Sequence, residues 1–117
     1  MKEQTSQKDI QSLFAFIDNS PTAYHAAANL GKMLAGEGFV CLEEKRAWEV
    51  QLGGKYYVNR NGSSIIAVTI PDKQPRGFHM TAAHSDSPCF KLKETAEIAV
   101  DDLYLKLNVE KYGGMIL

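Results

Sequence analysis

The hydrophobic pattern of the sequence changes at Gly36-Glu37-Gly38, and this change limits the folds that the chain can adopt. Before it, from Asp9 to Asp18, apolar residues recur at the i, i+3, i+4, i+7 spacing of one helix face. They are Ile10, Leu13, Phe14 and Ile17, with Phe16 slightly off the face. After it, aromatic and β-branched runs are typical of strands. The pattern predicts an α/β fold in which helices precede a β-sheet.

A second helix is expected after Asn19-Ser20-Pro21, where the first helix should end. Ser20 is the predicted N-cap and Pro21 the first helical residue, because proline needs no N–H there and its fixed φ suits a helix. The predicted buried stripe consists of Ala23, Ala26, Ala27, Leu30, Met33 and Leu34. Its small alanines allow close packing against the first helix, and the glycines near residue 37 permit a left-handed conformation at its end. The expected unit is an N-terminal helical hairpin.

The strongest turn signal in the sequence is Asn61-Gly62, which favours a tight β-hairpin. The flanking runs, Tyr56–Val58 and Ile65–Ile70, are rich in β-branched and aromatic residues, so two antiparallel strands are expected there. The next run, Gly77–Ala83, has small and apolar residues. That composition predicts a strand buried on both faces.

Two further strands are predicted near the C-terminus, at Cys89–Lys93 and Leu103–Val109. Apolar and polar residues alternate in both, as they do in half-exposed strands. Asp101-Asp102 is the predicted turn between them. Together with the earlier strands, this pattern predicts a mixed β-sheet after the helical hairpin.

Composition and charge exclude several classes of partner. The 117 residues fit one globular domain, and the net charge of -1 comes from 13 basic and 14 acidic residues without a like-charge block, so no nucleic-acid partner is expected. No apolar run reaches the roughly 20 residues of a membrane span, and the polar start, Met1–Thr5, lacks the apolar stretch of a secretory signal. A soluble cytoplasmic protein is expected, with Cys41 and Cys89 as reduced thiols.

The chemistry of the sequence is concentrated around His84, which directly follows the predicted buried strand. Open α/β sheets place ligand-binding groups just beyond strand ends. A neutral imidazole is a good zinc ligand, and Asp86 can accept a hydrogen bond from the other ring nitrogen and so fix the tautomer. The three-residue pattern is weak by itself, because a histidine beside an aspartate is more often a structural pair. His25 and His79 are expected to have packing or capping roles.

Four blocks, in the right order along the chain, resemble the aspartyl aminopeptidase family of zinc metallopeptidases. Two short ones are the metal motif His84-Ser85-Asp86-Ser87-Pro88 and the block Val109-Glu110-Lys111-Tyr112-Gly113-Gly114. The two longer ones are Phe16-Ile17-Asp18-Asn19-Ser20-Pro21-Thr22-Ala23-Tyr24-His25-Ala26 and the block from Gly53-Gly54-Lys55-Tyr56-Tyr57 to Ala67. The sequence departs from the family pattern at Cys89, Glu94 and Met115-Ile116-Leu117.

The resemblance implies a dinuclear zinc exopeptidase that removes N-terminal residues, often acidic ones, from peptides and assembles into homo-oligomers. Members are several times longer than this chain, so residues 1–117 are expected to be the N-terminal part of the metallopeptidase catalytic domain, truncated to an incomplete half. By position, His84 matches a zinc ligand and Asp86 the catalytic-site aspartate that orients it. The bridging aspartate, the general-base glutamate and the remaining ligands would follow Leu117.

The chain alone is therefore expected to be inactive and to bind zinc weakly or not at all, although the complete enzyme would hold two ions. The apolar end at Gly113–Leu117 fits a truncated chain. One alternative is a noncatalytic folding or oligomer-interface module in which the His-x-Asp pair is structural. Another is a small binding protein that is complete in itself.

Overall fold

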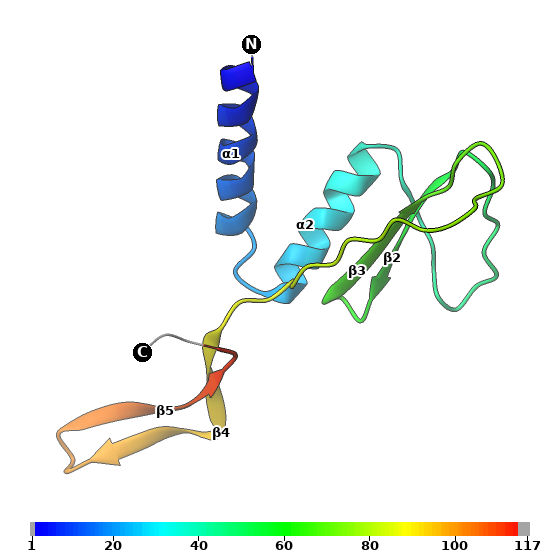
Figure 1. Cartoon of the computed structure of the whole chain (residues 1–117). Helices are drawn as coiled ribbons and strands as arrows, with labels where there is room; N and C mark the ends of the chain where they lie inside the picture. The colour runs from blue at the N-terminus through cyan, green and yellow to red at the C-terminus, as the bar shows by residue number, and fades with distance from the viewer. Residues whose placement is uncertain (1, 115–117) are drawn as a thin grey trace. The chain divides into compact units, whose positions relative to one another are not determined.

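The computed structural model describes residues 2–114 and divides into two compact units, unit 1 (Met1–Asp86) and unit 2 (Ser87–Leu117). Figure 1 shows the elements in chain order. In unit 1 these are α1 (Lys2–Asp18), α2 (Ala23–Gly36), β1 (Val40–Cys41), β2 (Lys55–Arg60) and β3 (Ser64–Thr69), and in unit 2 they are β4 (Cys89–Val100) and β5 (Tyr104–Tyr112). Met115-Ile116-Leu117, where the sequence departs from the family pattern, lie outside the described residues.

The sheet of unit 1 is mixed and has the strand order β1-β2-β3. β1 pairs with β2 in parallel, and β2 pairs with β3 in antiparallel register. At the turn between β2 and β3, Asn61 has φ 54° and Gly62 φ 73°, and Ser63 N donates to Arg60 O at 3.2 Å. Positive φ at both central residues is what a type I′ turn requires. The predicted hairpin is confirmed, and so is the fold class of two helices followed by a mixed sheet.

Helix α2 begins two residues later than the sequence predicts. Thr22 is the N-cap, and its Oγ1 accepts a hydrogen bond from His25 N at 3.4 Å. The prediction of Ser20 as the cap was wrong, because the Ser20 hydroxyl accepts from Asn29 Nδ2 at 3.2 Å instead of a helix N–H. The predicted left-handed glycine at the other end is confirmed. Gly38 has φ 80°, and Phe39 N donates to Leu34 O at 3.0 Å, which closes the helix as in a Schellman motif.

The described core of unit 1 lies on the two faces of the sheet, against α2 on one side and the segment after β1 on the other, and not between the two helices. Its buried apolar residues are Ala26, Ala27, Tyr56 and Val58. Gly31 of α2 lies so close to β2 that an added Cβ would be 3.5 Å from Tyr57 Cε2. Figure 1 shows α2 alongside β2 and β3. The face of α2 that carries small residues therefore packs against the sheet.

The expected close packing of α1 on α2 is therefore not found. The predicted apolar face of α1 remains at least 49% exposed, at Ile10, Leu13, Phe14 and Ile17. Phe16, which the pattern placed off that face, is half-buried. Met33 of the predicted α2 stripe is 57% exposed. In the described part of the chain, no helix is long and apolar enough to cross a membrane.

The predicted buried strand at Gly77–Ala83 is wrong, because these residues form no strand and are exposed. Phe78 is 86% exposed and Met80 88%. A doubly buried strand needs a hydrogen-bonded neighbour and a layer on each face. In residues 2–114, β3 pairs with β2 only, and no strand or helix covers this segment. The apolar composition was detected correctly, but the partners that would bury it are not among the described residues.

Unit 2 is one long hairpin of β4 and β5, and its predicted turn is confirmed. Asp101 has φ 51°, Asp102 has φ 54°, and Leu103 N donates to Val100 O at 3.0 Å. The register shifts between Leu92 and Glu97, where Asn108 Nδ2 donates to Thr95 O at 3.0 Å. Both strands exist but are longer than predicted. The alternation in sequence does not appear as alternation in burial, because none of the described residues of this unit is buried.

Candidate functional site

His84 and Asp86 form a pair in the coil that follows residue 77. His84 Nδ1 lies 3.2 Å from Asp86 Oδ1, and their side chains are 94% and 38% exposed. When Nδ1 of the imidazole is protonated, its N–H donates a hydrogen bond to the aspartate, and Nε2 keeps its lone pair. This is the arrangement by which a carboxylate fixes the tautomer and orientation of a metal-binding histidine.

Ser85, the residue between them, connects the pair to the hairpin of unit 1. Its Oγ donates to Ser63 O at 3.0 Å, and its side chain is half-buried. Sequence reasoning missed this residue, because a serine inside a short polar run has no periodicity that marks it. The only available signal for this contact was the Asn61-Gly62 turn, because a turn predicts a nearby backbone carbonyl that is not hydrogen-bonded to the neighbouring strand.

The described residues do not complete a metal centre around His84. They contain no group of three or more His, Cys, Asp or Glu side chains placed to hold an ion. A catalytic zinc ion takes about three protein ligands and a water. Of these groups, His84 offers one ring nitrogen, and Asp86 lies where it can orient that ring.

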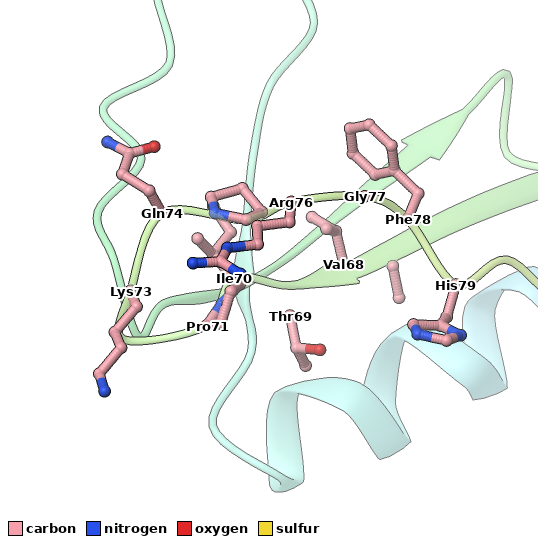
Figure 2. Close-up of a pocket in the computed structure, with 12 residues that line it drawn as sticks. Val68, Thr69, Ile70, Pro71, Lys73, Gln74, Arg76, Gly77, Phe78 and His79 are labelled. Carbon is pink, nitrogen blue, oxygen red and sulfur yellow. The ribbon is translucent and has the colours of Figure 1, made fainter.

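The other two histidines lie elsewhere in unit 1. His25 Nδ1 is 2.8 Å from Thr22 Oγ1 at the N-cap of α2, which confirms its capping role. His79 lines an open groove of about 1020 Å³ beside the end of β3, together with Lys73, Arg76 and Phe78 (Figure 2). The lining of that groove includes neither His84 nor Asp86. The groove is therefore separate from the His84–Asp86 pair.

Cys41 and Tyr57 face each other between β1 and β2, and both described cysteines are free thiols, as predicted. The hydrogen bond with Cys41, and secondly burial, raise the pKa of Tyr57 above its ordinary value of 10.0. The Tyr57 hydroxyl therefore stays protonated at neutral pH. Tyr57 is therefore not a candidate base.

Comparison with known proteins identifies the family of the chain. Residues 16–117 match the model of the family described as aminopeptidase I zinc metalloprotease (M18). A curated relative from Pseudomonas paraeruginosa, a probable M18 family aminopeptidase 2, is 44% identical over 108 residues, which cover 91% of this chain and 25% of the relative.

Solved structures agree with this assignment. One chain in a cryo-EM structure of an Ape4 and Nbr1 complex superposes with a TM-score of 0.83 at 38% identity, over 94% of this chain and 22% of that one. The S. cerevisiae mApe1 dodecamer gives a TM-score of 0.73 at 28% identity, over 96% of this chain and 27% of that one. The chain spans about a quarter of the length of the proteins it matches. It belongs to the M18 family of aminopeptidase I zinc metalloproteases.

Proposed function

We propose that residues 1–117 are the N-terminal part of the catalytic domain of a zinc aminopeptidase that removes acidic N-terminal residues from peptides. Membership of the M18 family supports the reaction class. The observation that carries the proposal is the 3.2 Å approach of His84 Nδ1 to Asp86 Oδ1 within the His84-Ser85-Asp86-Ser87-Pro88 block. The acidic preference rests on the resemblance to aspartyl aminopeptidases alone.

In this proposal His84 is a zinc ligand through Nε2, and Asp86 is the site aspartate that holds the imidazole in the required tautomer. The complete enzyme holds two zinc ions. When bound, zinc polarises the scissile carbonyl and lowers the pKa of a bound water. His84 supplies geometry and a lone pair and does not transfer a proton. Asp86 accepts a hydrogen bond from the Nδ1–H of His84.

The proposal includes the inactivity of the 117-residue chain on its own. The lack of a group of three ligand side chains among the described residues supports this, since one imidazole cannot hold a dinuclear centre. The chain alone should show no turnover of aminopeptidase substrates and no submicromolar zinc affinity.

The complete protein is proposed to be a homo-oligomer, a view that the dodecameric S. cerevisiae relative supports. The exposed apolar surface of the described residues is consistent with burial against further protein. A cytoplasmic location stays a prediction from the sequence.

Activity of the complete protein against aspartyl and leucyl arylamides tests the proposed function. We expect zinc-dependent hydrolysis, with the aspartyl substrate preferred, and loss of most of the activity in His84→Ala. His79→Ala is the matched control, because it removes an exposed imidazole from the same segment but outside the pair, and it should keep wild-type activity. Full activity in His84→Ala would favour the alternative, a noncatalytic folding or interface module with a structural His-x-Asp.

A further inference from the structure

The segment that carries His84 has few hydrogen bonds to the rest of unit 1. It starts where Gly53 N donates to Pro71 O at 3.1 Å. In the described part of the chain, residues 72–85 show one hydrogen bond to another element, from Ser85 Oγ to Ser63 O at 3.0 Å. The Ser85 side chain therefore connects the segment that carries His84 to the β2–β3 hairpin.

The acceptor of that hydrogen bond belongs to a well-defined turn. Ser63 follows the two positive-φ residues Asn61 and Gly62, and its N–H is bonded to Arg60 O at 3.2 Å. A Cβ added at Gly62 would lie 3.4 Å from Tyr24 Cδ1, so the turn lies against the first turn of α2. The residues on both sides of Ser63 are thus held, Gly62 beside α2 and Ser64 in the strand pair.

Ser85 lies at a bend of the chain, and its half-buried side chain reaches toward the hairpin. The flanking side chains, His84 and Asp86, meet each other at 3.2 Å. Because the anchor is the residue between the two, it constrains where both side chains lie.

We propose that Ser85 is a positioning residue, whose hydrogen bond to the Ser63 carbonyl holds His84 and Asp86 in place for metal binding. This inference rests on the proposed function of that pair. It also links three separated sequence blocks, since the Tyr24 region, the Asn61-Gly62 turn and the His84 motif form one continuous support. Ser85 itself does not touch the metal or the substrate.

The first test measures zinc affinity of the complete protein by competition with a chelator. Ser85→Ala should lower the affinity about tenfold, as loss of a supporting residue around a metal site does. Ser85→Thr keeps a hydroxyl and should restore it. Ser63→Ala is the matched control, because it removes the side chain at the other end of the contact but keeps the accepting carbonyl. It should bind zinc as the wild type does.

The second test measures amide hydrogen exchange of residues 77–86 in metal-free protein, which does not depend on zinc binding. Ser85→Ala should speed exchange there, while Ser85→Thr and Ser63→Ala should match the wild type. Wild-type zinc affinity and exchange in Ser85→Ala would overturn the proposal, as would a failure of threonine to restore both. Unchanged zinc in His84→Ala would instead overturn the proposed function, and the exchange result would still decide the role of Ser85.

Discussion

The two hairpins of this chain share a turn geometry but differ in what covers them. Both reverse direction through two residues with positive φ, Asn61-Gly62 between β2 and β3 and Asp101-Asp102 between β4 and β5. Helix α2 covers one face of the first hairpin, and on the other face Tyr56 and Val58 are buried beside Leu42, Trp48 and Val50. No described residue of the second hairpin is buried. A turn decides where a chain reverses, but an isolated two-stranded hairpin needs a packed layer to be stable.

The largest expected effect separates the two hairpins by their tyrosines. Tyr56 is 7% exposed and its hydroxyl accepts from Gln51 N at 2.9 Å, whereas Tyr104 is 56% exposed. Tyr56→Ala should lower the free energy of unfolding by about 3 kcal/mol, as large-to-small changes of buried aromatic residues do. Tyr104→Ala, the matched control, should change it by less than about 0.5 kcal/mol. Denaturant titration measures both, and equal losses would contradict the difference in covering.

A smaller effect is expected at the first turn. Gly62 has φ 73°, a conformation that a β-branched residue adopts only with strain. Its added Cβ would also lie 3.4 Å from Tyr24 Cδ1. Gly62→Val should therefore lower the free energy of unfolding by about 1 kcal/mol or more. An unchanged thermal midpoint would show that the turn does not require this geometry.

The smallest effect has the opposite sign and concerns the second turn. Asp102 has φ 54° and is not a glycine, so its backbone conformation carries strain that Gly62 avoids. Asp102→Gly should stabilise the β4–β5 hairpin by about 0.5 kcal/mol, after the greater freedom of glycine in the unfolded chain is subtracted. Slower amide exchange in β4 and β5 would confirm this. Exchange that is unchanged or faster would show that the turn is not the weak point of that hairpin.

Local signals in the sequence predicted local structure well. Asn61-Gly62 and Asp101-Asp102 marked both turns, and Gly38 marked the end of α2, because each depends on backbone preferences of one or two residues. The Ser20 prediction was wrong because a distant side chain, Asn29, took the hydroxyl. A rule for helix starts that considers only neighbouring residues cannot detect a hydrogen bond from a residue farther along the chain.

Predictions that depend on partners were less successful. The apolar character of Gly77–Ala83 indicated a buried strand, but burial requires elements that the described residues do not provide. For the same reason the apolar face of α1 is exposed. At the site, the motif predicted that His84 and Asp86 approach each other, and the structure shows this. Ser85 was missed because its role depends on a carbonyl 22 residues away.

Zinc content of the complete protein, measured for three variants beside the wild type, tests the central claim most directly. His84→Ala should lose most of the zinc at one of two sites, since it removes a ligand. Asp86→Asn should keep the ligand but weaken zinc affinity or activity by about 10 to 100-fold, because the amide cannot accept and orient as the carboxylate does. His79→Ala should keep full occupancy. Unchanged zinc in His84→Ala would contradict the assignment of this histidine to the metal site.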